Sequence, residues 1–220
     1  MGGPQGAVLL KPAKALLALA MCLFLGVFVS LRRHAGHMAE LSALAAAGTS
    51  TGLSEVRNSA VTYARSMRGL PYDPLKGEQG DPFGKIGFVV CIDVPLRAYM
   101  HAGFDPAGML RQAAQEHPSW FSIDKGNQPG NRFFYRRVRN YVGLFKNHPA
   151  LETSGRPQPG DWAFFGPYHI ALVSTVFPDG RYEVIEASGR KMHVGTNTGE
   201  KMEQTWGPPL FFGRWRARTI

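Results

Sequence analysis

The first feature of the hydrophobic pattern is one long apolar segment near the start of the chain. Residues 15–31 carry no charge, and two basic residues stand on each side of them (Lys11, Lys14, Arg32 and Arg33). This length is at the short end of what spans a bilayer as a helix. We predict a transmembrane helix over 15–31, with residues 1–14 cytoplasmic. A cleaved signal peptide and a buried core helix stay open as alternatives, although no small-x-small cleavage site closes the run.

Amphipathic helices are predicted after this segment. Residues 32–53 are rich in Ala, Gly, Ser and Thr, which is typical of a juxtamembrane linker. Apolar side chains then recur at helical spacing over 54–68, with Ser54 as the expected N-cap and Gly69 as the stop. Helical composition predicts a helix over 93–102, Asp105 or Pro106 is expected to begin a short helix over 106–116, and apolar residues at helical spacing predict a helix over 132–146.

The pattern changes to a period of two after Pro159. Alternating, β-branched and aromatic residues predict four strands, over 161–165, 169–177, 181–187 and 210–219. Pro178-Asp179-Gly180 is a hairpin turn between the second and the third. Helices followed by antiparallel strands indicate an α+β domain over 54–220, in which N-terminal helices pack on an antiparallel β-sheet.

Composition and charge narrow the function classes. Apolar residues make up 44% of the chain, which argues against wholesale disorder. The net charge is +9, and the four basic residues around the apolar segment leave about +5 for the rest, which favours anionic surroundings such as a cell-wall polymer. No nucleic-acid module, phosphate-binding motif or metal-ligand spacing is present, so we expect no nucleic acid, cofactor or metal.

Three residues suggest nucleophilic chemistry. Cys91 stands at the start of a predicted helix, where free N–H groups and the helix dipole stabilise a thiolate. His169 opens a strand and could serve as base, and Glu186 on the next strand could orient its ring. Counting across the hairpin turn sets His169 opposite about Gly189, so Glu186 needs a β-bulge or an offset, and Ser188 is the fallback.

Each of these residues also has a structural interpretation. Cys91 could be a buried structural thiol and His169 a hydrogen-bonded surface residue. Asp93 is expected to be an N-cap, with a role in the site as the alternative. We expect three arginines on a solvated helix face or in contact with an anionic polymer, namely Arg136, Arg137 and Arg139. Trp162 and Trp215 are expected in the core, and His193 in a loop.

In order along the chain, these segments resemble the NlpC-like branch of the papain superfamily, which comprises bacterial cell-wall amidases and peptidases. The matching segments are Gly69-Leu70-Pro71-Tyr72, Cys91 at a helix start, Pro159-Gly160-Asp161 before the strand of His169, and Ile185-Glu186-Ala187-Ser188. The resemblance implies a papain-like fold, Cys91 as nucleophile, His169 as base and Glu186 as the third residue. It also implies that Tyr72 hydrogen-bonds near the thiol and that substrate binding involves Tyr72, and Asp93 if it has a role in the site.

The sequence departs from that family around the nucleophile. The usual Asp-Cys-Ser-Gly core is absent, since Val90 precedes Cys91 and Ile92-Asp93 follows it. Residues 91–99 and 136–140 are closer to an uncharacterised bacterial subfamily, a domain of unknown function. We therefore expect fold and nucleophile to carry over better than substrate.

The resulting hypothesis is a membrane-anchored cysteine amidase or peptidase that cleaves an amide bond, with peptidoglycan peptides as the expected substrate. Its catalytic domain is expected to be periplasmic or extracellular, or secreted if the N-terminal segment is cleaved. Two alternatives use the same residues. One is a catalytically silent cell-envelope binding module, and the other is an acyltransferase.

Overall fold

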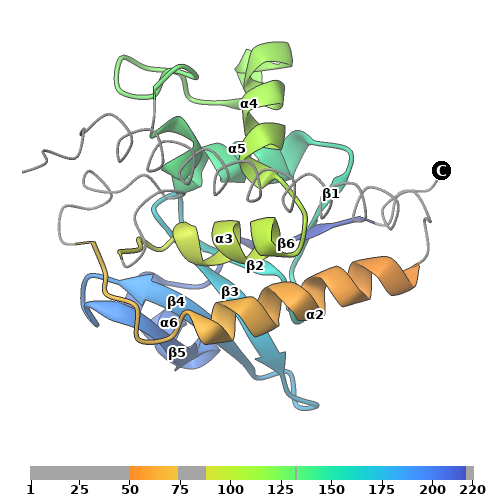
Figure 1. The fold of residues 1–220 in the computed structure, drawn as a ribbon, viewed down its shortest axis with the longest axis vertical. Coiled ribbons are helices and arrows are strands. Elements are labelled where there is room, and N and C mark those ends of the chain that lie inside the picture. The colour runs from red at the N-terminus through yellow and green to blue at the C-terminus, as the bar shows by residue number, and fades with distance from the viewer. Residues whose placement is uncertain (1–49, 74–87, 132, 217–220) are drawn as a thin grey trace, which may run out of the picture. The chain divides into compact units, whose positions relative to one another are not determined.

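The structure is a computed structural model that describes residues 50–73, 88–131 and 133–216 (Figure 1). The predicted transmembrane segment 15–31 lies outside these residues. Within them, no helix has the length and apolar character needed to cross a membrane. The helices before the sheet are α2 (Ser50–Ser66), α3 (Asp93–His101), α4 (Pro106–Glu116) and α5 (Val138–Asn147), with 3-10 turns η1 (Pro118–Trp120) and η2 (Phe134–Arg136).

Six strands form one antiparallel sheet, which confirms the predicted α+β class. Their order across the sheet is β1-β6-β2-β3-β4-β5. The neighbouring pairs are all antiparallel. The strands are β1 (Leu151–Ser154), β2 (Trp162–Phe165), β3 (His169–Val176), β4 (Tyr182–Ser188), β5 (His193–Thr198) and β6 (Phe211–Trp215).

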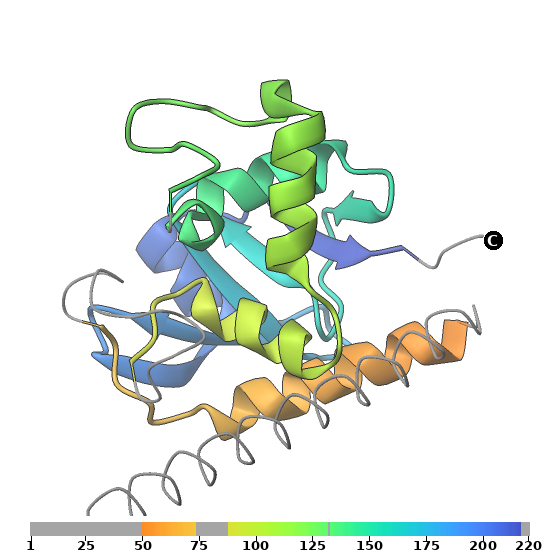
Figure 2. The ribbon, with the colours of Figure 1, turned by 45° about the horizontal axis from the view of Figure 1, so that its top comes forward.

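Helices cover both faces of the sheet. Figures 1 and 2 show α2 and α3 lying across one face, and Figure 1 shows α6 (Gly199–Trp206) behind the other. Alternation along β3 divides the core accordingly, because successive side chains point to opposite faces. Ile170 and Leu172 belong to the large core with α2–α5, whereas Ala171 and Val173 pack in a smaller core with Met202 of α6. Trp162 and Trp215 are core residues, as predicted.

The helix predictions were good at α4 and poorer at two other places. Asp105 caps α4 by accepting a 2.8 Å hydrogen bond from the Gly108 N–H, and the helix covers 106–116 as predicted. Helix α2 already includes Ser50, so the predicted cap Ser54 lies inside it and the last four residues of the predicted linker are helical. The predicted helix over 132–146 is interrupted, because Arg137 has an extended backbone between η2 and α5.

Three elements were missed by the sequence analysis: β1, β5 and α6. Strand β5 pairs with β4 over six residues, so the prediction that His193 lies in a loop was wrong, since it is the first residue of β5. The prediction failed because β5 is rich in Gly, Thr and Asn, which are typical of turns. Pairing with β4 outweighs these local preferences.

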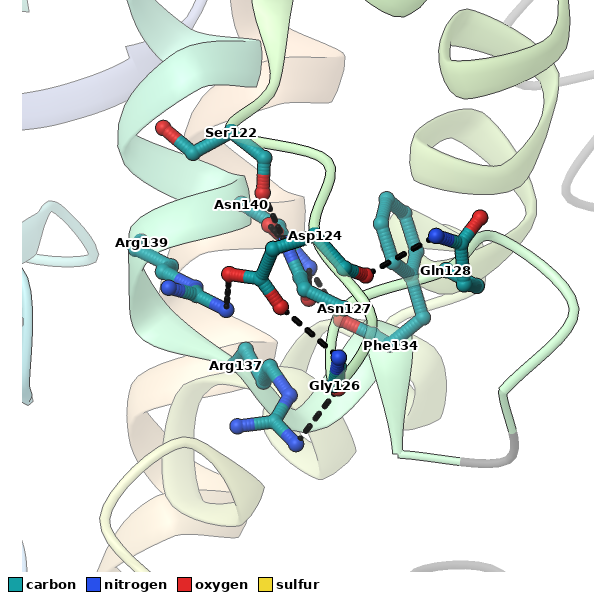
Figure 3. Close-up of polar contacts among 9 residues, drawn as sticks. All are labelled: Ser122, Asp124, Gly126, Asn127, Gln128, Phe134, Arg137, Arg139 and Asn140. Atoms are coloured by element: carbon teal, nitrogen blue, oxygen red, sulfur yellow. Dashed lines mark hydrogen bonds and ion pairs between the residues drawn. The ribbon is translucent and has the colours of Figure 1, made fainter.

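The arginines expected on a solvated helix face are held by the protein instead. Arg137 donates to the Gly126 carbonyl at 2.9 Å, and Arg139 donates to the Asp124 carboxylate at 2.9 Å (Figure 3). Figure 3 also shows the amides of Asn127 and Asn140 facing one another, and each donates to the other, at 2.8 and 3.0 Å. Buried amides that satisfy each other in this way fix the loop over 122–128 against α5.

Candidate active site

Cys91 lies in a tight turn just before α3. The Asp93 N–H donates to the Val90 carbonyl at 3.0 Å, and the Val90 N–H donates to the Asp93 carboxylate at 2.9 Å. Both bonds join Val90 to Asp93, so they form a closed turn that contains Cys91. The thiol itself is partly exposed and lies 3.8 Å from the Tyr168 carbonyl oxygen. The turn therefore fixes the position of a reachable thiol at a helix N-terminus, as predicted.

Asp93 anchors this turn from inside the protein. It is fully buried, and Arg136 donates to both of its carboxylate oxygens, with the Nε···Oδ1 contact at 3.1 Å. The prediction that Asp93 is the N-cap was wrong, because Ile92 is the cap and Asp93 is the first residue of α3. Because Asp93 is fully buried, substrate cannot reach its carboxylate without a rearrangement, so we assign it to the turn and not to substrate binding. Arg136 is buried, contrary to the expectation of a solvated residue.

His169 follows a short turn that joins β2 to β3. Gly166 adopts φ 69°, a conformation that suits glycine, and Phe165 pairs with His169 across the hairpin. The imidazole is only 3% exposed. Cys91 lies near this ring, since its Sγ is 3.8 Å from the carbonyl oxygen of the preceding residue, Tyr168, and Cys91 is among the groups that raise the pKa of His169. The structure thus brings together the predicted nucleophile and base, which are 78 positions apart in the chain.

A β-bulge places Glu186 on the same side of the sheet as His169. The register of β3 and β4 shifts between Val173 and Thr175, and beyond the shift Leu172 pairs with Ile185. Continuing this register sets His169 opposite Ser188 rather than Gly189. Because side chains alternate between faces, this one-residue change moves Glu186 to the face of His169. The bulge that Glu186 requires is therefore present.

Glu186 contacts the base directly. Its Oε2 lies 3.2 Å from Nε2 of His169, and both side chains are buried. The other ring nitrogen, Nδ1, is then the one left for a contact with Cys91. The contact is an ion pair whose N–H direction is off line, since among the described residues neither Nε2 nor Oε2 has an aligned hydrogen-bond partner.

Further polar residues bind the other carboxylate oxygen of Glu186, Oε1. Asn197 of β5 donates to Oε1 at 2.8 Å, and Ser188 donates to the same oxygen at 3.4 Å. Lys191 in turn donates to the Asn197 side-chain oxygen at 2.7 Å. Neither Asn197 nor Lys191 was predicted to belong to the site, because β5, the strand that carries Asn197, was not predicted. A connected polar network of this kind orients the residue that touches the base.

The contacts of His169 set its protonation state. Burial lowers the pKa of the imidazole, but the polar contacts and negative charges of Cys91 and Glu186 outweigh burial and raise the pKa to about 9. At neutral pH His169 is therefore doubly protonated, that is, a positively charged imidazolium. This is the form that can protonate a leaving group.

Tyr72 lies close to the site in the segment between α2 and the Cys91 turn. Its N–H donates to the Met192 carbonyl at 2.8 Å, and it bridges to Val89. Burial raises the pKa of its phenol to about 12, with a contribution from the negative charge of Cys91, so the hydroxyl stays protonated near the thiol. The predicted hydrogen bond near the thiol stays a prediction.

Trp206, the last residue of α6, completes the surroundings of the base. Its ring stacks on the His169 imidazole with centroids 4.1 Å apart and planes 8° from parallel. No signal in the sequence predicts this contact, because α6 was not predicted and a single Trp before Gly-Pro-Pro is typical of a loop.

The predicted nucleophile, base and third residue thus lie in one region of the structure. In the described part of the chain, no three His, Cys, Asp or Glu side chains lie together in a way that could hold a metal ion. No protein-family model matches the chain, and no curated protein matches it.

Proposed function

We propose that this protein is a cysteine hydrolase of the papain-like, NlpC type that cleaves an amide bond. The observation that carries the proposal is the meeting of Cys91, His169 and Glu186, which come from the start of α3, the start of β3 and the end of β4. A buried imidazole between a partly exposed thiol and a buried carboxylate is the arrangement that activates a thiol. A structural cysteine needs no such partners.

The proposed reaction has two steps. The Cys91 thiolate attacks the amide carbonyl, and the His169 imidazolium gives its proton to the leaving nitrogen as the C–N bond breaks, so that a thioester forms on Cys91. A water molecule then attacks the thioester. His169 takes a proton from that water, the C–S bond breaks to release the carboxylic acid and the Cys91 thiolate, and the proton stays on His169, so the starting state returns.

The backbone around Cys91 suits this chemistry. The Cys91 N–H precedes the first turn of α3, so it is a candidate donor to the oxyanion that forms in each step. The helix dipole of α3 adds positive potential at the same place. The Asp93–Arg136 pair holds this backbone from inside the protein.

We propose peptidoglycan peptides as the substrate and the cell envelope as the location. The net charge of +9 favours an anionic polymer, and the uncharged segment over 15–31 would anchor the domain to the membrane. The resemblance to cell-wall amidases supports both. In this proposal the catalytic domain lies outside the cytoplasm.

Substitution of the nucleophile tests the activity. We expect the full-length protein to release new amino and carboxyl groups from a mixture of peptidoglycan fragments, detected by mass spectrometry, and Cys91→Ala to release none. Cys22→Ala is the matched control, because it removes the chain's other thiol and should leave the activity unchanged. Equal product from the Cys91→Ala and native proteins would refute the proposal. A native protein that binds the fragments without cleaving them would favour the binding module.

The pKa of His169 predicts how the activity depends on pH. We expect the rate to fall as the pH rises through about 9, because the imidazolium that protonates the leaving group is lost there. Glu186→Gln removes a negative charge that raises this pKa, so the falling limb should move to lower pH. Glu183→Gln on the same strand is the control and should leave the limb in place. A limb that is unmoved in Glu186→Gln would show that Glu186 does not act on the base.

A further inference from the structure

Three imidazole rings in the described residues stack on an aromatic ring, and one of them differs from the other two. His101 stacks on Tyr63 at 4.2 Å, and His117 stacks on Trp120 at 4.2 Å. Both of these histidines are exposed. In the third stack, His169 is buried, and the ring that covers it, Trp206, is itself 39% exposed. The indole therefore lies between the imidazole and solvent.

The end of α6 that carries Trp206 is firmly held. The Thr198 side chain caps the start of the helix by accepting from the Lys201 N–H at 3.3 Å, and Met202 is buried in the smaller core. At the other end, Gly207 turns the chain away with φ 83° and donates to the Glu203 carbonyl at 2.8 Å. The indole is therefore presented to His169 from a fixed backbone.

The contact with Glu186 alone leaves the orientation of the imidazole open. The Nε2···Oε2 distance is 3.2 Å, but the N–H direction is off line, so this ion pair constrains distance more than ring plane. A flat ring 4.1 Å away does constrain the plane, because rotation of the imidazole about its Cβ–Cγ bond would drive its edge into the indole. An indole face also attracts a protonated imidazole.

We propose that Trp206 is a positioning residue for catalysis, which fixes the plane of the His169 imidazole beside Cys91 and keeps water from one of its faces. This inference rests on the proposed function. Trp206 acts through the base and touches no reacting atom. The guanidinium carbon of Arg190 lies over the Trp206 ring, 5.8 Å from the ring centroid, and this contact helps to hold the indole in place. A base held in one plane keeps Nδ1 directed at the thiol through both steps.

The test compares a flat with a non-flat replacement. The rate of iodoacetamide alkylation of Cys91 is measured at pH 7 in the full-length chain by peptide mass spectrometry, which separates Cys91 from Cys22. We expect Trp206→Phe to react within about twofold of the native protein and Trp206→Leu about tenfold more slowly, because Leu keeps apolar packing but offers no flat face. Trp120→Leu is the matched control, since it removes the indole from an exposed histidine, and should react like the native protein.

A double variant separates positioning from packing. If Trp206 acts through His169, Trp206→Leu should slow the reaction no further in a His169→Ala background. A native rate in Trp206→Leu, or an equal added loss in the double variant, would overturn the inference. If His169→Ala itself reacts like the native protein, the proposed function fails instead. Thermal melting of Trp206→Phe and Trp206→Leu shows whether both are folded. If their melting temperatures are equal, a difference between their alkylation rates does not come from unfolding.

Discussion

Arg136→Met is expected to lower the free energy of unfolding by about 3–5 kcal/mol, because it leaves the Asp93 carboxylate buried without its partner. The Arg136 and Asp93 side chains are 4% and 0% exposed, and Arg136 contacts both carboxylate oxygens. The loss is measured by urea unfolding. Because Asp93 also binds the Val90 N–H, we expect the turn that carries Cys91 to loosen in the same variant.

A double variant and a surface pair sharpen this prediction. Asp93→Asn in the Arg136→Met background removes the unpaired charge while keeping an acceptor for the Val90 N–H, so it should recover part of the lost stability. Arg181→Met is the control, because its ion pair with Asp179 has a similar length of 2.7 Å but is largely exposed, and should not change unfolding measurably. Equal stability of Arg136→Met and the native protein would contradict the structural role of the pair.

Local signals along the chain predicted the parts of the fold that depend on neighbours in sequence. Helix α4 was placed correctly from Asp105 and Pro106 as its expected start, and the β3–β4 hairpin from the turn at 178–180. Cys91 was placed before a helix for the same kind of reason. Its proximity to His169 was expected only through the order of the segments, and in the structure Cys91 lies close enough to raise the pKa of His169.

Contacts between distant segments could not be predicted in this way. The run of arginines over 136–139 suggested a solvated face, but Arg136 pairs with a carboxylate 43 positions away that no local pattern identifies. Strand β6 joins the sheet between β1 and β2, which only the folded chain decides. The bulge that puts Glu186 beside His169 was required by counting, yet nothing in the sequence of β3 marks its position between Val173 and Thr175.

His169→Ala is expected to slow the alkylation of Cys91 by about 100-fold at pH 6, because an unassisted thiol, whose pKa is about 8.5, is almost entirely protonated there. In the native protein His169, whose pKa is raised to about 9, is positively charged at pH 6, and a cation beside a thiol favours its reactive form. His193→Ala is the matched control. It removes an exposed imidazole that also opens a strand, and should react like the native protein.

The pH dependence of Cys91 alkylation by iodoacetamide, in the native protein and in His169→Ala, tests the Cys91–His169 pair most directly. We expect the native protein to react nearly as fast at pH 6 as at pH 8, and His169→Ala to react only as the pH approaches the pKa of an ordinary thiol, about 8.5. If both proteins follow the curve of an ordinary thiol, or if Cys91 is inert in both, the catalytic pair does not exist, and the site would then be one that binds without catalysis.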